Sequence, residues 1–171
     1  KGKKVLCLAS GGGQQGPILA AAGADVTVFD LSENQLAQDT QVAKRDGLTL
    51  TIVKGDMTDL SCFENESFDL VFHPCSNNFV PEISGLWAEA ARVLKVNGRL
   101  LSGFINPAAS IFDWFEAEKG VTTVRHKLPF SDINNLIQAE LALLKEQDEP
   151  LVFSHSFEEQ IKGQLDNGLV L

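Results

Sequence analysis

A glycine-rich turn near the start of the chain constrains the fold more than any other stretch. Four apolar residues, 5–8, precede this turn, and an alanine-rich run that begins at Pro17 follows it. A short apolar run bounded by glycines predicts a buried strand, and an alanine-rich run with proline in its first turn predicts a helix. Gly11, Gly13 and Gly16 satisfy the pattern G-x-G-x-x-G. Because glycine has no side chain, this pattern allows a tight turn and lets a ligand approach bare backbone.

An acidic residue follows the second predicted strand. Residues 25–29 form that strand, and Asp30 ends it, 19 residues after Gly11. An acidic side chain about 20 residues after the first glycine accepts hydrogen bonds from a ribose diol. Together the two features indicate a nucleoside-binding site. The alternative is a glycine-rich turn that joins strand to helix without a ligand.

The length and charge of the whole chain limit the classes of protein to which it can belong. Its 171 residues suit one domain, and 44% hydrophobic with 22% charged residues are ordinary for a soluble globular protein. No apolar run approaches the ~20 residues of a membrane span, and no signal peptide precedes Val5, so we expect a cytoplasmic protein. The net charge of −9 argues against binding to nucleic acids or membrane surfaces and favours a neutral or cationic small molecule. The oligomeric state stays open.

The three cysteines indicate neither a disulfide framework nor a metal site. Cys7, Cys62 and Cys75 are odd in number and lack C-x-x-C spacing, so we expect reduced thiols and no bound metal. Cys7 lies within the first predicted strand and is interpreted as a core residue. Cys75 follows the fourth predicted strand, where a reactive thiol is the alternative to an inert loop residue.

Alternating strands and helices predict the fold class. Ser32 and Gln35 have the spacing of a capping box and predict the start of a helix. Five strands that alternate with helices imply right-handed crossovers and a doubly wound, mainly parallel α/β sheet. In such sheets a ligand binds at the carboxyl ends of the strands, where the strand order reverses. After the second strand, the expected elements are a helix at 32–46, a strand at 48–53, a strand at 68–72, a helix at 81–94 and a strand at 99–104.

The regular alternation of strands and helices ends after Phe104. We expect a single domain over 1–171, in which residues 1–104 form a cofactor-binding core and residues 105–150 form an insertion or lid over the substrate cleft. Residues 169–171 are apolar and predict the first residues of a further strand. We therefore expect the C-terminal strands of the sheet to be incomplete. The other expected elements are a strand at 121–128, a helix at 131–145, a strand at 151–154 and a helix from Ser156 to Asp166.

With these elements in order, the chain resembles the class I S-adenosylmethionine-dependent methyltransferases, in particular the bacterial enzymes of small-molecule type. The resemblance covers residues 5–104 and implies a Rossmann-like sheet. It rests on five matches: the glycine-rich motif at 5–13, the acid Asp30, the Gly-Asp-Met turn at 55–57, the Phe-Asp-Leu-Val strand at 68–72, and the helix end, Asn-Gly turn and strand at 94–104.

The resemblance also implies a cofactor, S-adenosyl-L-methionine, with S-adenosyl-L-homocysteine as product and a small molecule as methyl acceptor. According to this resemblance, Gly11 and Gly13 pass under the methionine moiety and Asp30 binds the ribose hydroxyls. Asp56 and Met57 lie on either side of the adenine. The cofactor-binding residues that it implies are Ala9, Ser10, Gly11, Gly13, Gln14, Asp30, Leu31, Asp56, Met57 and His73.

His73 is the candidate catalytic base, because it ends the fourth predicted strand and an unperturbed imidazole titrates near working pH. The alternative for His73 is a histidine that shapes the pocket or hydrogen-bonds to backbone. A general base is not obligatory, since placing the acceptor in line with an already activated methyl group supplies most of the acceleration.

Two departures from the family pattern keep other functions open. The family usually has an acid at the position of Cys7 and a glycine at the position of Ala9. We expect either a lower cofactor affinity or a contact from Ser10, Gln14 or Gln15 in place of the lost acid. One alternative is an NAD(P)- or flavin-dependent oxidoreductase, which shares the glycine pattern and the acid; the turn at 55–57 and the absence of tyrosine argue against it. Another is a non-catalytic cofactor-binding module of the same fold.

Overall fold

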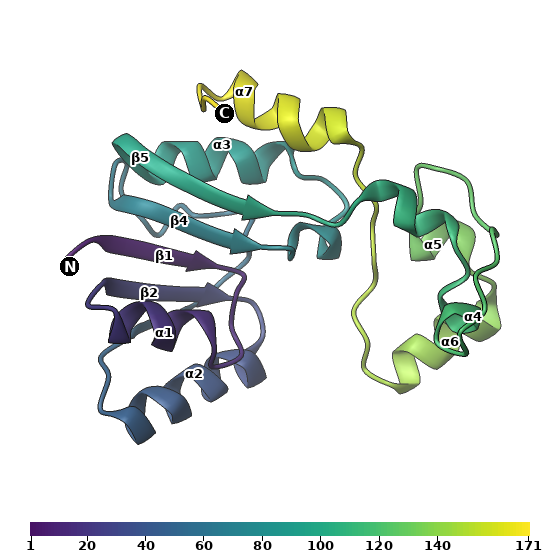
Figure 1. Cartoon of the computed structure of the whole chain (residues 1–171), viewed down its shortest axis with the longest axis horizontal. Helices are drawn as coiled ribbons and strands as arrows, with labels where there is room; N and C mark the ends of the chain where they lie inside the picture. Colours follow the sequence, from purple (N-terminus) through teal and green to yellow (C-terminus); the bar gives the residue numbers. More distant parts are fainter.

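The structure is a computed structural model that describes residues 1–171, and its centre is a five-stranded parallel sheet (Figure 1). The strand order is β3-β2-β1-β4-β5, so the order reverses between β1 and β4, which both pair with their neighbours in parallel. The predicted doubly wound parallel sheet is therefore confirmed. The strands are β1 (Lys4–Leu8), β2 (Asp25–Asp30), β3 (Thr51–Lys54), β4 (Phe68–Pro74) and β5 (Leu94–Gly103).

Helices cover both faces of this sheet. Successive residues of a strand point to opposite faces. In β1, Val5 and Cys7 pack with residues of α1 and α2, whereas Leu6 and Leu8 pack with residues of α3, including the fully buried Trp87. The helices of the sheet layer are α1 (Gln15–Ala21), α2 (Glu33–Asp46), α3 (Ser84–Val93) and α7 (Gly163–Asp166), the last continuing the π-helical turn η3 (Glu158–Lys162). No helix has the length and apolar character needed to cross a membrane.

Helix α2 begins and ends where the sequence predicts, but only half of its capping box forms. The Ser32 hydroxyl accepts a hydrogen bond from the Gln35 N–H at 3.3 Å, and Gly47 ends the helix in the left-handed region, with φ of 65°. The Ser32 N–H does not bond to the Gln35 side chain; it donates to Asp30 Oδ1 at 2.9 Å. A charged carboxylate is the stronger acceptor, which accounts for the difference.

Three predicted boundaries in the core are wrong by several residues. Strand β5 begins at Leu94, because Leu94 pairs with Phe68 of β4. The register then shifts through an irregular stretch, in which Asn97 has φ of 62°, before the pairing with β4 resumes. Helix α3 begins at Ser84 rather than 81, since residues 77–79 form the short 3-10 turn η1 (Asn77–Phe79) and the chain stays extended at Val80. Strand β3 begins at Thr51, where its pairing with β2 begins.

Residues 105–155 form a small lobe that projects beyond the sheet, and the strand arrows point toward it (Figure 1). The strands predicted at 121–128 and 151–154 do not form; they are reduced to single bridges between Phe112 and Val124 and between Ser131 and Phe153. The helix predicted at 131–145 is divided by extended backbone at Leu136 and Ile137. The lobe contains η2 (Pro107–Ile111), α4 (Trp114–Ala117), α5 (Asp132–Asn135) and α6 (Gln138–Glu146).

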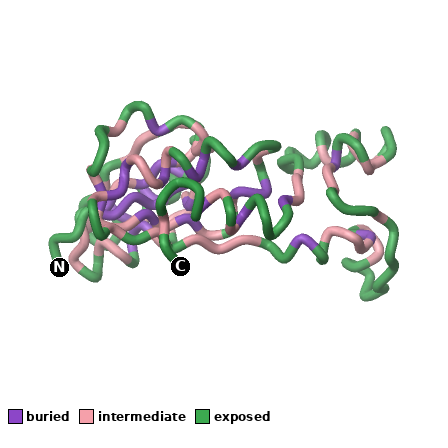
Figure 2. Tube along the Cα trace, turned by 90° about the horizontal axis from the view of Figure 1, so that it is seen from above, coloured by how far each residue is buried: buried purple, intermediate pink, exposed green.

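The lobe has almost no core of its own, as Figure 2 shows. Between residues 105 and 155 only Pro107, Asp113, Asp132 and His155 are buried. Polar contacts hold it instead: the Arg125 guanidinium donates to Asp113 Oδ2 at 3.0 Å and to Glu140 Oε1 at 2.6 Å. The short elements of the lobe are therefore fixed by individual pairs of side chains and not by a hydrophobic stripe.

After the lobe the chain returns to the sheet and packs on α3. The Ser156–Glu159 capping box forms in full, with the Glu159 N–H donating to Ser156 Oγ at 3.1 Å and the Ser156 N–H donating to Glu159 Oε2 at 2.7 Å. A Cβ on Gly163 would lie 2.4 Å from Trp87 Cδ1, so only glycine allows this contact between α7 and α3. Residues 169–171 form no strand. No strand pairs with the outer side of β5, which is one of the two edge strands of the sheet.

Candidate functional site

The glycine loop, residues 9–14, lies at the carboxyl end of β1 and turns directly against α2. Gly12 and Gly13 have φ of 114° and 75°, a region that favours glycine. A Cβ on Gly11 would lie 2.7 Å from Gln35 Cβ and 3.0 Å from Asp30 Oδ2. Ala9 adopts φ of 47°, which costs a residue with a side chain about 1–2 kcal/mol. The loop thus presents backbone at a place where side chains do not fit.

Asp30 joins the end of β2 to this loop. Its Oδ2 accepts a hydrogen bond from the Gly11 N–H and its Oδ1 accepts one from the Ser32 N–H, both at 2.9 Å. A carboxylate has about four lone-pair sites, so each oxygen can accept a further hydrogen bond. The side chain is partly exposed and can both fix the loop and meet a polar ligand.

A second carboxylate, Asp39 of α2, contacts the same loop and was missed by the sequence analysis. It is fully buried, and its Oδ2 accepts a hydrogen bond from the Gly12 N–H at 2.9 Å. Burial raises the pKa of Asp39, while the N–H groups of Gly13 and Gly12 oppose that rise. One signal could have revealed it: Asp39 lies on the buried face of α2 with Leu36 and Ala43, where a charged residue is unusual.

Asp39 adds a third possibility to the two expected for the missing acid at Cys7, which were a lower cofactor affinity or a contact from Ser10, Gln14 or Gln15. Burial raises the pKa of the Cys7 thiol to about 12, so this residue is neutral and belongs to the core. The Ser10 hydroxyl is buried without a hydrogen-bond partner, and no side-chain hydrogen bond links Gln14 to the loop. The carboxylate at the loop comes from the neighbouring helix.

The turn after β3 supplies the next predicted residues. A Cβ on Gly55 would lie 2.2 Å from the Phe29 ring, which explains why glycine is needed there. Asp56 is exposed, and its Oδ1 accepts hydrogen bonds from the N–H and hydroxyl of Thr58 at 2.9 and 2.8 Å. Met57 is half-buried against the core, and Leu31 at the end of β2 is 63% exposed.

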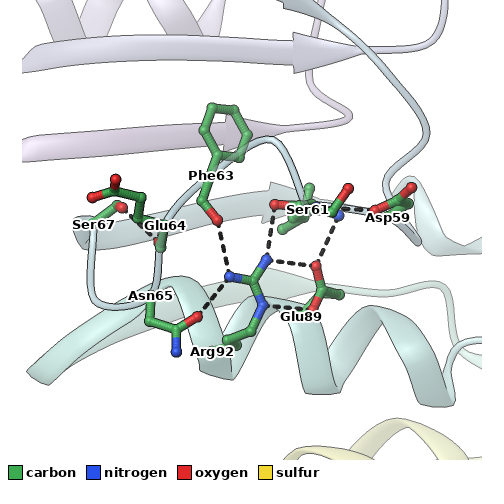
Figure 3. A network of polar contacts seen from close by, with 9 residues as sticks. Asp59, Ser61, Phe63, Glu64, Asn65, Ser67, Glu89 and Arg92 are labelled. Carbon is green, nitrogen blue, oxygen red and sulfur yellow. Dashed lines mark hydrogen bonds and ion pairs between the residues drawn. The ribbon is translucent and has the colours of Figure 1, made fainter.

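A polar network from α3 fixes the loop that follows this turn (Figure 3). The Arg92 guanidinium donates to the carbonyl oxygens of Phe63 and Leu60 at 2.9 and 2.8 Å, and it pairs with Glu89 at 2.7 Å. Glu89 Oε2 accepts a hydrogen bond from the Leu60 N–H at 2.9 Å. The network ties residues 60–65 to the helix.

His73 lies at the end of β4 but faces the interior. It is fully buried, and its Nδ1 lies 2.9 Å from the Leu8 carbonyl oxygen. Because a carbonyl only accepts, Nδ1 carries the proton and Nε2 is left without a hydrogen-bond partner. Burial lowers the pKa of His73, so the ring is neutral. This geometry favours the interpretation of His73 as a histidine that hydrogen-bonds to backbone, and its role as catalytic base stays a prediction.

The predicted residues fall into two groups. The glycine loop and Asp30 are joined by hydrogen bonds, and the Ser76 hydroxyl, in the loop after β4, donates to the Ala9 carbonyl oxygen. Asp56 and Met57 lie at the carboxyl end of β3, which pairs with β2 up to Asp30 and Lys54. All of these residues therefore lie at the carboxyl ends of the strands.

Comparison with known proteins identifies the family. A family model described as a methyltransferase domain matches residues 6–102, which is more than half of the chain. The chain belongs to the methyltransferase family. This methyltransferase is 56% identical over 171 residues to the uncharacterized methyltransferase YbaJ of Bacillus subtilis; the match covers 100% of the chain and 67% of YbaJ.

Two other comparisons, one of sequence and one of structure, agree with this assignment. Demethylmenaquinone methyltransferase of Clavibacter sepedonicus is 38% identical over 101 residues, covering 58% of this chain and 40% of that enzyme. An S-adenosylmethionine-dependent methyltransferase from Mesorhizobium loti has a similar structure, with a TM-score of 0.72 at 17% identity over 98% of this chain and 74% of that one. At this identity the structural match supports the fold alone.

Proposed function

We propose that this chain transfers a methyl group from S-adenosylmethionine to a small-molecule acceptor. The family supports methyl transfer, and the observation that carries the choice of donor is the pair of carboxylates at the glycine loop. The Gly11 and Gly12 N–H groups both donate to aspartates, Asp30 and Asp39. A loop that binds a pyrophosphate instead directs free N–H groups at the anion.

The charge of this site fits the donor and disfavours a dinucleotide. Asp30 is common to both kinds of site, so the difference comes from Asp39. Its carboxylate occupies the Gly12 N–H and would repel a pyrophosphate at the loop, since like charges at close range oppose binding. This disfavours the oxidoreductase alternative, which needs a nicotinamide or flavin dinucleotide at the same loop. Two further features fit the donor: the Ser10 hydroxyl is buried and unpartnered, and the backbone of Gly11 leaves no room for a Cβ.

The residues that would hold the donor follow from their positions. Asp30 would accept the ribose hydroxyls, Asp56 and Met57 would contact the edge and face of the adenine, and the glycine loop would contact the methionine moiety. S-adenosylmethionine supplies a methyl group already activated by the sulfonium. The chain's own contribution is to bind, orient and exclude water. The neutral, buried His73 would hold the Leu8 carbonyl oxygen at the end of β1 rather than take a proton.

We further propose that residues 105–150 form part of the acceptor site. A cavity of about 870 Å³ lies between the lobe and the start of α3 and η3, and its size is typical of small-molecule sites. The lining residues come from the start of α3, the lobe, η3 and α7, and none of them belongs to the glycine loop, to Asp30 or to the turn at 55–57. Its lining includes Ile83 of the core, Leu128 of the lobe and Phe157. Four acidic residues and one basic residue also line it: Glu82, Glu158, Glu159, Asp166 and Lys162. This lining fits a neutral or cationic acceptor with an apolar part.

Calorimetric titration tests the choice of donor. We expect S-adenosylmethionine and S-adenosylhomocysteine to bind the purified chain with micromolar affinity and NAD to show no binding. Binding of NAD without the other two would contradict the proposal and restore the oxidoreductase alternative. Binding of the first two without transfer to any acceptor tested would support a non-catalytic module instead.

A further inference from the structure

Asp39 is a buried charged residue, and the proposed function assigns it no contact with the methyl donor. Its side chain has no exposed surface, and its Oδ1 has no hydrogen-bond partner. Burial of a carboxylate is unfavourable unless nearby groups compensate. The compensation here comes from the glycine loop, since the Gly12 N–H donates to Asp39 Oδ2 at 2.9 Å.

The contact between Asp39 and the loop is part of a close fit to α2. The Gly12 N–H also lies 3.2 Å from the Gln35 carbonyl oxygen, so it is shared between the helix backbone and Asp39. A Cβ on Gly13 would lie 3.1 Å from the Gln38 carbonyl oxygen, and one on Gly16 would lie 3.1 Å from Asp39 Oδ1. The loop and the start of α1 are therefore packed closely against residues 35–39 of α2.

A loop of this composition needs such an anchor. Gly11, Gly12 and Gly13 are consecutive, and glycine populates left-handed and right-handed backbone about equally. Without fixed partners the loop would sample many shapes, and binding would have to select one of them, which lowers affinity. Two adjacent N–H groups are held by carboxylates from different elements, Asp30 from β2 and Asp39 from α2. Neither β1 nor α1 supplies a charged partner, because Cys7 is neutral and the first turn of α1 has no acidic residue.

We propose that Asp39 is a positioning residue that holds the glycine loop in the shape that receives the methyl donor. This inference rests on the proposed function and deepens it, since Asp39 acts through Gly12 and does not itself touch the donor. Asp30 contributes to the same anchoring but also lies partly exposed toward the ligand. Asp39 is fully buried, so its effect on binding is indirect and can be measured apart from ligand contact.

The test is calorimetric titration of S-adenosylhomocysteine and of adenosine into the wild type, Asp39→Ala and Asp39→Asn. We expect Asp39→Ala to lose about tenfold or more in affinity for S-adenosylhomocysteine, because a charged hydrogen bond to the loop is lost. Adenosine lacks the methionine part, so its affinity should change much less. Asp39→Asn keeps an acceptor oxygen and should recover part of the loss. The matched control is Asp46→Asn, an exposed aspartate of the same helix, which should bind both ligands as the wild type does.

Hydrogen exchange provides a readout that does not depend on a ligand. In the free protein, the Gly12 amide of Asp39→Ala should exchange faster than in the wild type, while the amides of β1 should not change. Equal losses for adenosine and S-adenosylhomocysteine would indicate a general structural role and overturn the proposal, as would unchanged affinity in both variants. If Asp39→Ala does not fold, the same comparison in Asp39→Asn decides. If the wild type itself binds no S-adenosylhomocysteine, the proposed function fails, and the positioning role fails with it.

Discussion

Individual carboxylates at the glycine loop have separable roles. Asp30 accepts one hydrogen bond on each oxygen, from Gly11 and from Ser32, and it keeps an exposed surface. Asp39 is buried, and the hydrogen bond that its side chain accepts comes from the loop. Removing Asp30 should therefore affect the ligand directly, whereas removing Asp39 should act through the backbone of the loop.

Asp30→Ala should weaken the binding of S-adenosylmethionine by ~1.5–3 kcal/mol, because its carboxylate would accept the ribose hydroxyls. Calorimetry at one temperature measures this change. Asp25→Ala is the matched control, since Asp25 is an exposed aspartate at the opposite end of the same strand. Affinity that is unchanged in Asp30→Ala would refute the ribose assignment.

His73 makes a prediction about the pH dependence of stability. Burial lowers its folded-state pKa below the ordinary value of 6.5. The unfolded state therefore binds more protons than the folded state below that value, and the free energy of unfolding should decrease as the pH falls from about 7 to about 5. The slope is at most about 1.4 kcal/mol per pH unit for one proton.

Denaturant unfolding of the wild type and His73→Gln over this range measures that dependence. Glutamine can donate to the Leu8 carbonyl oxygen but does not titrate, so the difference between the two proteins isolates His73 from other groups, including Asp39. A difference in the free energy of unfolding that stays constant with pH would show that His73 does not titrate as described.

At the scale of elements, the junction between α7 and α3 depends on a single glycine. Trp87 is fully buried, and Gly163 is the position of α7 that lies against it. Gly163→Ala should lower the free energy of unfolding by about 1–3 kcal/mol, because the new Cβ would overlap the indole unless the helix moves away. Gly85→Ala in α3 is the control: its Cβ would have no neighbour closer than 4.0 Å, and alanine favours a helix. Equal stability of Gly163→Ala and the wild type in denaturant unfolding would contradict this description of the junction.

Elements with a hydrophobic pattern could be predicted from the sequence, and elements fixed by polar pairs could not. Strands β1, β2 and β4 follow apolar runs, and Ser32 marks the start of α2. The lobe gave no such signal, because single contacts such as Arg125 with Asp113 and Glu140 fix its short helices. Long-range pairing also decides boundaries, as at Leu94, where the strand begins because Phe68 lies beside it.

The same distinction applies to the candidate site. The glycine spacing and Asp30 follow a known pattern of residues along the chain, so both could be identified before the structure. Asp39 could not, since its contact with Gly12 links residues 27 apart through the packing of a helix on a loop. The burial of His73 could not be inferred either: a histidine after a strand was expected to face the cleft, but its ring turns inward to the Leu8 carbonyl oxygen.

At the scale of the whole molecule, the polar lobe lies beyond the carboxyl ends of the strands of the sheet core. The strand arrows point toward the lobe, and the glycine loop, Asp30 and the turn at 55–57 lie at the carboxyl ends of these strands (Figure 1). This arrangement is consistent with a donor held by the core and an acceptor held between core and lobe. The central claim is that the donor binds at the glycine loop anchored by Asp30 and Asp39.

The most direct test of this claim is to follow backbone amide resonances during titration with S-adenosylhomocysteine. We expect the largest shifts at residues 9–14, at Asp30 and Leu31, and at Asp56 and Met57, with little change in the lobe distant from the cavity. Shifts confined to other parts of the molecule, or saturation without any change at Gly11 and Gly12, would contradict it.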